Sequence, residues 1–307
     1  GQTPTHIRIP MLHITNGYSV SRYSVSLDKA GLPGSALYWV DVLHEGPVPA
    51  GLSLDELSEL RWQQPVCFRE RDATLKSFRE HEEVALWFEH DLYDQLLLIQ
   101  LLHWFASQRL GKTRLSLICV DQYLGTLQPA ELNRLFPQRH EVSASEFQTA
   151  QLAWEAFTSP EPSALLRLMQ NGTAALPFLN RAILRHLEQF PGLRDGMSRT
   201  ERQALQIARS GPHGFQNMFQ ADQDLEERIF MGDDTYRHHL SRLCGAKHPA
   251  LAESREGYRL TDFGRSVLAG EEDHVAVNGI DRWLGGVHLH GTSPVWRWDA
   301  QRSTIAS

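Results

Sequence analysis

Two short apolar segments that each end in a cluster of acidic and histidine side chains constrain the fold of this chain most. Residues 39–49 read WVDVLHEGPVP, and residues 86–95 read LWFEHDLYDQ. A strand that is buried on both faces of a parallel sheet is apolar along its length, so the polar residues mark where each strand ends. Because open α/β sheets bind ligands at the carboxyl ends of their strands, the pattern predicts an α/β fold with a site at the strand tips.

The first half of the chain alternates between strand-like and helix-like segments. Strands are expected at residues 12–15, 36–42, 83–88 and 114–120, and helices over much of 53–80 and 91–105. Helical crossovers of this length connect parallel strands. The pattern therefore predicts a Rossmann-like, largely parallel sheet domain over residues 11–145, to which residues 140–142 could add one strand.

The second half of the chain is expected to be mostly helical. We expect a helical connector over residues 146–196 and a module with winged-helix character over residues 197–275. Ser198 and Glu201 have the spacing of a capping box, which predicts a helix that begins after Ser198. Residues 276–307 are rich in Trp and Gly, and because Trp side chains are costly to expose, this tail should pack on another domain.

Composition narrows the class of protein further. A length of 307 residues is enough for two domains, and a net charge of −7 lacks the basic surplus of a general nucleic-acid binder. Cys67, Cys119 and Cys244 are odd in number and widely spaced, which is typical of reduced thiols in a cytoplasmic protein. No apolar stretch is long enough for a membrane span. Residues 1–10 have no signal-peptide pattern, so we expect a tag remnant or a disordered extension.

Four stretches together resemble an uncharacterised bacterial family, domain of unknown function 1835. They are LHITNG at residues 12–17, WVDVLHEGPVPAG at 39–51, LWFEHDLYDQL at 86–96 and GIDRWLGGVHL at 279–289. The resemblance covers nearly the whole chain after Met11. It implies a Rossmann-like N-terminal domain and a helical C-terminal region, and it brings no activity, substrate or catalytic residue. This chain has Tyr18 where the family usually has an aspartate, so it lacks a carboxylate at that position.

The candidate site residues lie at strand tips that a parallel sheet would bring together. We expect His44 or His90 to act as general acid and base, because imidazole titrates near neutral pH. Asp41 and Glu89 would orient that histidine or bind the substrate. The candidates for substrate binding are His13, Thr15, Asn16, Glu45 and Asp91, together with Arg282 if the tail reaches the crevice.

Other interpretations of the same region stay open. Asp91 stands where a helix N-cap belongs, so its role can be purely structural. A divalent metal is the weaker alternative, because neither HExxH nor a DxDxDG loop occurs. Its ligands would be His44, Glu45, Glu89 and His90. No phosphate-binding glycine motif and no GxSxG elbow is present, and Cys67 has no candidate base nearby in sequence.

A DNA-binding role for the C-terminal module is opposed by its charge. Residues 236–242 could form a recognition helix that turns Arg237, His238 and Arg242 toward a groove. From residue 198 to the end there are 13 Lys and Arg against 15 Asp and Glu, so the net charge is 13 − 15 = −2. Because phosphate backbones are bound chiefly by positive charge, we do not expect nucleic acid as the partner.

Together these observations predict a cytoplasmic enzyme, a hydrolase or group transferase, that acts at the strand tips. Its substrate would be a small polar, phosphorylated or nucleotide molecule. The alternative is a ligand-sensing regulatory or adaptor protein that uses the winged-helix module to bind a partner. The sequence leaves open the cofactor, the reaction and whether the chain forms a homo-oligomer.

Overall fold

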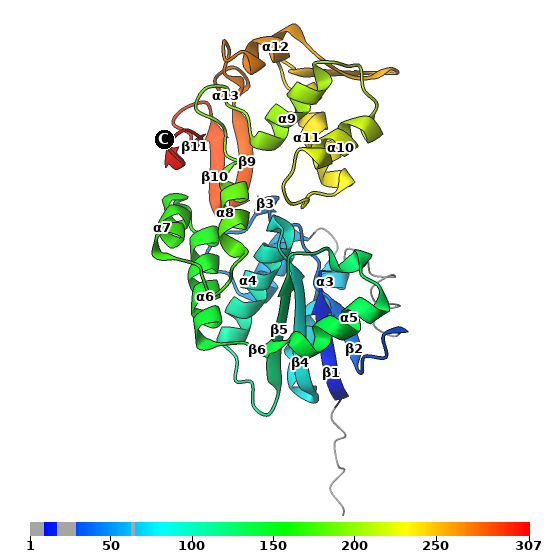
Figure 1. Ribbon diagram of the computed structural model, residues 1–307. Coiled ribbons are helices and arrows are strands. Elements are labelled where there is room, and N and C mark those ends of the chain that lie inside the picture. The colour runs from blue at the N-terminus through cyan, green and yellow to red at the C-terminus, as the bar shows by residue number, and fades with distance from the viewer. Residues whose placement is uncertain (1–8, 17–28, 63–64) are drawn as a thin grey trace, which may run out of the picture.

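A five-stranded sheet organises the N-terminal half of the protein (Figure 1). The computed structural model describes residues 9–16, 29–62 and 65–307. The strands, in their order across the sheet, are β2 (Ser35–Tyr38), β1 (Ile9–Thr15), β4 (His81–Glu89), β5 (Arg114–Val120) and β6 (His140–Glu141). The first four run parallel, and β6 is antiparallel to β5. The predicted α/β fold with a largely parallel sheet is confirmed.

The side chains of β4 alternate between two separate apolar layers. Leu86 and Phe88 belong to the large core that includes α4, whereas Trp87 belongs to a smaller core shared with Leu132 on the opposite face. Successive side chains of a strand point to opposite faces, so both faces of β4 are covered. This explains why residues 84–88 of the strand are apolar and why its polar side chains stand at the two ends, with Glu89 at the carboxyl end.

The helix that follows β4 is buried nearly all round. This helix, α4 (Leu92–Ala106), packs against the sheet on one side and against α6 (Ala144–Thr158) and α8 (Leu179–Leu187) on the other. A helix that is apolar on all sides is typical of such a position. Residues 146–196, expected as a connector, therefore help to cover the sheet. The other helices here are α2 (Leu54–Arg61), η1 (Phe78–Glu80), η2 (Leu124–Thr126), α5 (Pro129–Leu135), η3 (Phe136–Gln138), α7 (Ser163–Asn171) and α3 (Pro65–Lys76).

The C-terminal half contains three helices, a hairpin and two short helices. In chain order these are α9 (Arg199–Ala208), α10 (Phe215–Asp224), α11 (Asp233–Gly245), β7 (Leu251–Ser254), β8 (Gly257–Leu260), α12 (Asp262–Leu268) and α13 (His274–Asn278). The capping box predicted at the start of α9 is present, with Ser198 Oγ accepting from the Glu201 amide at 3.1 Å. The N-cap of α11 is Gly232.

The C-terminal tail joins the two halves of the molecule. Its strand β9 (Ile280–Gly285) pairs with β10 (Val287–Gly291) and, in parallel, with β3 (Gly46–Pro47) of the N-terminal half. The Gly286 amide also donates to the Phe157 carbonyl at 3.0 Å. A second small sheet holds β11 (Arg297–Asp299) and β12 (Thr304–Ala306). The tail thus lies against the α/β part rather than extending from it.

The N-terminal boundary differs from the one expected. Strand β1 begins at Ile9, so residues 9 and 10 are part of the sheet and not of an extension. The preceding residues 1–8, for which a tag remnant or disorder was expected, lie outside the described part of the chain, as does Tyr18. Strand β2 ends at Tyr38 and not at residue 42, which places Asp41 in a loop.

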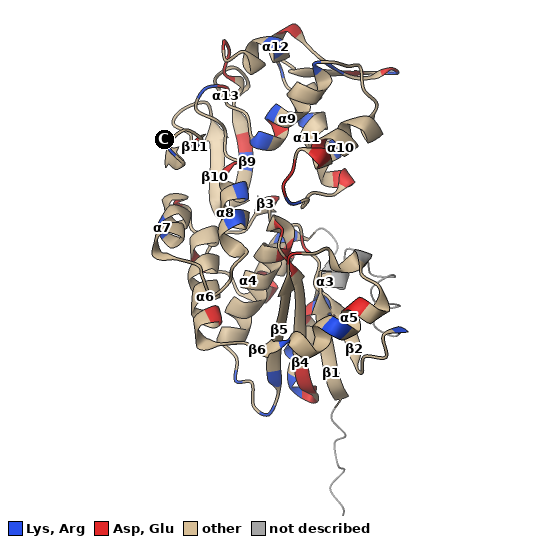
Figure 2. Ribbon diagram, viewed as in Figure 1, with Lys and Arg blue, Asp and Glu red and all other residues tan. Residues whose placement is uncertain are grey.

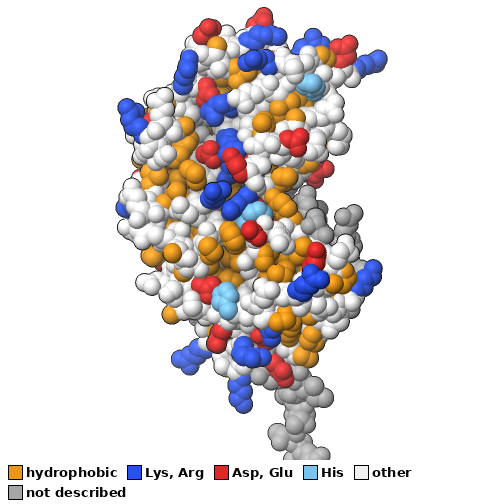
Figure 3. Space-filling model, in the orientation of Figure 1, with side chains coloured by type: hydrophobic (Ala, Val, Ile, Leu, Met, Phe, Trp, Pro, Cys, Tyr) orange, Lys and Arg blue, Asp and Glu red, His pale blue; other side chains and the backbone are white. Residues whose placement is uncertain are grey.

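Charged side chains gather where the two halves meet. Figure 2 shows acidic residues near the upper ends of the strands and basic residues on α8 and α9. In the space-filling view, Lys, Arg, Asp and Glu side chains lie side by side across the middle of one face (Figure 3). Within the described residues, no helix is both long enough and apolar enough to cross a membrane.

Candidate functional site

A cavity of about 450 Å³ lies at the carboxyl ends of the parallel strands, and we call it the strand-tip cavity. One wall comes from the strand tips and the start of α4, and the other from the loop that precedes α11. The lining residues are Asn16, Val42, His44, Glu89, Asp91, Tyr93, Asp94, Tyr123, Gly125, residues 229–232 of the loop and residues 233–235 of the first turn of α11. The site is therefore formed by both halves of the chain.

Three buried carboxyl groups form one cluster in this cavity. Glu89 is the last residue of β4, Asp91 caps α4, and Asp94 lies in the first turn of that helix. One oxygen of each lies within 4.8 Å of the others. Asp91 accepts from the Asp94 amide at 3.1 Å, and Asp94 accepts from the Glu89 amide at 2.7 Å. The tight turn from strand to helix brings the three groups together.

Burial changes the protonation of this cluster. It raises the pKa of Glu89 to about 8, with the nearby charge of Asp91 as the next cause, and it raises the pKa of Asp91 to about 6. Burial and the two neighbouring carboxyl groups also hold the pKa of Asp94 well above its usual value. Three carboxylates this close cannot all be ionised in a low-dielectric site without a compensating cation. At neutral pH Glu89 therefore keeps its proton.

His44 borders the same cavity. Its side chain is 2% exposed, and its ring packs edge-on against Phe230 at 5.0 Å between centroids. Within the described residues, Nδ1 of His44 makes no hydrogen bond, although it lies 3.9 Å from Oε1 of Glu45. An imidazole beside carboxyl groups at a cavity wall can accept or donate a proton.

His90 faces a different cavity. It borders a space of about 330 Å³ that Asp91 also lines, and we call this the arginine cavity. Its ring lies 5.2 Å from that of Tyr123, and burial, followed by the charge of Arg228, lowers its pKa. His90 and His44 are thus on the walls of two adjoining cavities rather than of one.

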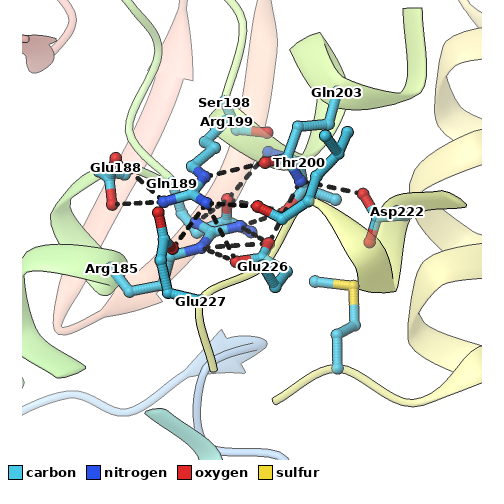
Figure 4. A network of polar contacts seen from close by, with 12 residues as sticks. Arg185, Glu188, Gln189, Ser198, Arg199, Thr200, Gln203, Asp222, Glu226 and Glu227 are labelled. Atoms are coloured by element: carbon cyan, nitrogen blue, oxygen red, sulfur yellow. Dashed lines mark hydrogen bonds and ion pairs between the residues drawn. The ribbon is translucent and has the colours of Figure 1, made fainter. Parts of the chain in front are cut away.

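A network of ion pairs forms the far wall of the arginine cavity (Figure 4). Glu226 binds Arg185 at 2.7 Å and Arg199 at 3.4 Å, and all three line the cavity. Arg185 also donates to Gln189 and Thr200, both on buried segments. The network fixes α8 against α9 and gives that wall a rigid, charged surface. Its positive charge is largely matched by glutamates.

Two of the predicted site residues are held by other partners. Asp41 accepts two hydrogen bonds from Arg61, at 2.7 and 2.8 Å, and Arg61 also donates to carbonyls of the same loop, including that of Val42. Glu45 accepts from Nε2 of His239 at 2.6 Å, and this contact holds its pKa well below the usual value although burial opposes it. Neither residue lines the strand-tip cavity.

Three further candidates also lie outside the strand-tip cavity. His13 is buried, donates from Nε2 to the Pro33 carbonyl at 2.8 Å and accepts from Trp87 at Nδ1. Thr15 is buried next to the site but does not line it. Arg282, on β9, binds Glu201 at 3.3 Å in the C-terminal half. Of the site residues predicted from the sequence, the structure brings Asn16, His44, Glu89 and Asp91 into one cavity.

The group of side chains closest to a metal-binding arrangement is not the predicted one. Of His44, Glu45, Glu89 and His90, only Glu89 belongs to the set that comes together, because Glu45 is paired with His239 and His90 faces the arginine cavity. Carboxylate oxygens suit magnesium, calcium or manganese better than zinc. Glu89, Asp91 and Asp94 are the described residues that could hold such a cation.

The described cysteines are not poised as nucleophiles. Burial raises the pKa of Cys119 to about 12 and that of Cys244 to about 11, so both stay protonated at neutral pH. A thiol needs to ionise before it attacks. Cys67 lies in α3, but its side chain is outside the described part of the structure.

Sequence reasoning missed several residues of the strand-tip cavity. Tyr93 lies in the first turn of α4, between Asp91 and Asp94. The sequence DLYD at the start of that helix could therefore have indicated that Tyr93 lines the same cavity. Tyr123 and Phe230 had no such signal. Tyr123 donates to the Ile229 carbonyl at 3.2 Å, so these positions meet only because the two halves of the chain fold against each other.

Comparisons with known proteins do not identify this chain. No family model and no curated protein matches its sequence. Among solved structures, it is similar to the crystal structure of a Plasmodium falciparum topoisomerase II DNA-binding, cleavage and re-ligation domain, with a TM-score of 0.46 and 11% identity. That match covers 81% of this chain and 44% of the other, so this chain spans less than half of that domain. We draw no conclusion about fold or function from a likeness of this size.

Proposed function

We propose that this protein is an enzyme, a hydrolase or group transferase, that works in the strand-tip cavity. The observation that carries the proposal is the meeting of three buried carboxyl groups and His44 on the wall of one cavity. Its volume of about 450 Å³ is within the range of small-molecule sites. Titratable groups with strongly shifted pKa values in a cavity are typical of active sites.

The carboxyl groups support general acid and base catalysis. Glu89, with a pKa of about 8, can give its proton to a leaving group at neutral pH. Asp91, with a pKa of about 6, can take a proton from the attacking water or hydroxyl group. His44 is the second candidate base. After turnover Glu89 is ionised and Asp91 is protonated, so the pair returns to its starting state when Asp91 passes its proton to Glu89, or when Asp91 releases it to solvent and Glu89 takes one up from solvent.

The cavity walls favour a small ligand with both apolar and polar parts. Tyr93, Tyr123 and Phe230 supply aromatic surface, while Asn16 and the carboxyl groups supply hydrogen-bonding partners. This fits a small polar or nucleotide substrate. A phosphorylated substrate would place its charge near Arg228 of the adjoining arginine cavity.

A second function is favoured by the C-terminal module. Helices α9, α10 and α11 followed by the hairpin β7–β8 have the element order of a winged helix. If that module binds a protein partner, the chain would be a cytoplasmic ligand-sensing adaptor, with the same cavity as sensor. Membership of the domain of unknown function 1835 family is likewise our proposal, based on the four sequence stretches.

The experiment compares Glu89→Gln and His44→Ala with the wild-type protein. The matched control is Glu82→Gln, because Glu82 is an exposed carboxylate at the other end of the same strand. Each protein is incubated with nucleotides, sugar phosphates and p-nitrophenyl esters, with Mg²⁺ or with EDTA, while turnover and thermal shift are measured. A ligand at 100 times its dissociation constant stabilises a protein by about 2.7 kcal/mol.

The outcomes separate the two functions. Turnover in the wild type and in Glu82→Gln, lost in Glu89→Gln with the fold retained, supports the enzyme. Binding without turnover, weakened by His44→Ala, favours the sensor. If no compound in this panel is turned over or bound by the wild type, the strand-tip cavity is not a site for these ligand classes and the proposal fails.

A further inference from the structure

A separate cavity of about 560 Å³ lies in the C-terminal half, and we call it the tail pocket. Its walls come from the end of α11, from α13 and from the start of β9. None of its lining residues lines the strand-tip cavity. The tail pocket is therefore a second candidate site, independent of the proposed catalytic one.

Two buried polar groups of this pocket have no hydrogen-bond partner within the described residues. They are Nε2 of His274 and Nε of Arg282, and both residues line the pocket. His274 is 9% exposed, and the Arg282 side chain is 10% exposed. A buried polar group without a partner costs free energy unless a ligand or water satisfies it. Both can act as donors, since the Nε2–H tautomer of neutral imidazole donates and Arg has only donors.

The charged side chains of the pocket leave positive charge unmatched. Glu201 is paired with Arg282 at 3.3 Å, and Asp281 with His288 at 2.7 Å. Arg242 and Lys247 also line the pocket, and within the described residues neither has a carboxylate partner among the ion pairs.

The pKa shifts of these groups agree with this pattern of ion pairs. Although burial would raise the pKa of Glu201, the charge of Arg282 holds it far below the usual range, so Glu201 stays ionised and neutralises that arginine. Burial, and then the charge of Arg282, lowers the pKa of Arg242, although the charges of Glu45 and Glu201 act in the opposite direction. Although burial opposes it, the charges of Glu201 and Glu45 raise the pKa of Arg282. Arg242 is therefore the less compensated guanidinium, and a nearby anion would stabilise it.

We propose that the tail pocket binds an oxyanion, the phosphate or carboxylate group of a small molecule. Arg282 and His274 would donate from the buried wall, and Arg242 and Lys247 would supply charge from the rim. Hydrogen bonds between such cations and oxyanions are short and strong, and the planar guanidinium matches both phosphate and carboxylate. The site goes beyond the proposed function, because it needs no residue of the strand-tip cavity.

A small molecule fits the pocket better than a nucleic acid. The two unpartnered donors are buried in a concave space, whereas a duplex backbone presents its phosphates to an exposed basic surface. The surrounding region, residues 198–307, has a net charge of 13 − 15 = −2. A duplex would be repelled by that surplus of acidic side chains, while one oxyanion feels mainly the groups next to it.

The test measures binding of phosphate, sulfate, acetate and citrate to the full-length protein by calorimetry. Sodium chloride keeps the ionic strength constant, because phosphate and sulfate also stabilise proteins by exclusion from the surface. The histidine ring protons are followed by NMR as a local reporter of His274. The variants are His274→Gln and Lys247→Gln, and the control is Lys112→Gln, an exposed lysine in the loop between α4 and β5.

We expect at least one of these oxyanions to bind wild type and Lys112→Gln equally, and His274→Gln and Lys247→Gln at least tenfold more weakly. The His274 resonance should shift in step with the heat. Phosphate or sulfate binding alone identifies a phosphate-type ligand, and acetate or citrate binding alone a carboxylate. The proposal is overturned if no anion binds, if all variants bind equally, or if only a short DNA duplex binds. None of these results depends on turnover.

Discussion

Asn16 donates its side-chain amide to both carboxylate oxygens of Asp94, at 2.9 and 3.2 Å. Asn16 directly follows β1, and Asp94 lies in the first turn of α4. The same Asp94 accepts from the Glu89 amide, so one buried carboxyl group ties together the tips of the neighbouring strands β1 and β4 and the helix that follows β4. Asp94 thus positions the site, while Glu89 and Asp91 hold the protons that chemistry would need.

Asn16→Leu tests this brace. The change keeps the size of the side chain but removes both hydrogen bonds to Asp94, which within the described residues still accepts from the backbone amide of Glu89. A buried acceptor that loses its partner costs about 1–3 kcal/mol, so we expect the free energy of unfolding to fall by about 2 kcal/mol. Urea denaturation measures it. An unchanged midpoint would mean that the amide does not stabilise the strand tips.

Glu89→Gln should change how stability depends on pH. The pKa of Glu89 is about 8 in the folded protein against an ordinary value of 4.5. Between these values the folded state holds a proton that the unfolded state has released, so the wild type loses stability as pH rises from about 4.5 to about 8. Gln stays neutral and avoids that loss.

At about pH 8.5 the free energy of unfolding of Glu89→Gln should therefore exceed that of the wild type by an amount on the order of a few kcal/mol, and its melting temperature should be higher. Near pH 4.5 the two proteins should be equally stable. Circular dichroism melts across this range measure the difference. Glu82→Gln, with an exposed carboxylate on the same strand, should show no such gain. A gain in both variants would contradict a specific role for Glu89.

Asp41→Asn separates a structural carboxylate from a catalytic one. Asp41 and Arg61 form a buried, two-fold hydrogen-bonded pair, with side chains 8% and 6% exposed. Removing one charge leaves the other uncompensated, which typically costs 3–5 kcal/mol. We expect guanidinium denaturation to show a loss of about 3 kcal/mol, while ligand binding well below the melting temperature is kept. If Asp41→Asn lost ligand binding but kept normal stability, Asp41 would instead have a direct role in the site.

The sequence pattern located the strand tips but not the partners of each polar group. The abrupt end of an apolar run pointed to Glu89 and Asp91, and both line the cavity, because a buried strand can place polar side chains only at its end. Asp41 and Glu45 follow the same pattern, yet their partners are Arg61 and His239, the second of them 194 residues away. A local pattern carries no information about a partner so distant in the chain.

The second wall of the strand-tip cavity lay outside sequence reasoning for the same reason. Phe230 and Met231 sit in a loop with no motif, and they reach the site because the C-terminal half folds back over the strand tips. The placement depends on strand pairing in the tail, where β9 adds to a two-residue strand, β3, that is too short to be recognised from periodicity. What could be predicted was which residues end a strand, and what could not was which surfaces meet.

Gly286→Ala tests how much the molecule depends on that junction. A Cβ at Gly286 would collide with the backbone carbonyl of Thr158 at the end of α6, where backbone cannot move aside as a flexible side chain can. We expect a loss of about 3 kcal/mol in unfolding free energy, because overpacking of this kind strains a close-packed contact.

The control is Gly245→Ala at the end of α11, where no atom lies within 4 Å of the added Cβ. A helical Ala there should be neutral or stabilising by up to about 1 kcal/mol. Urea denaturation followed by limited trypsin digestion measures both changes. Faster cleavage at the exposed Arg302 in Gly286→Ala alone would show that the tail has been released from α6. Equal behaviour of the two variants would mean that the tail is held by its other contacts.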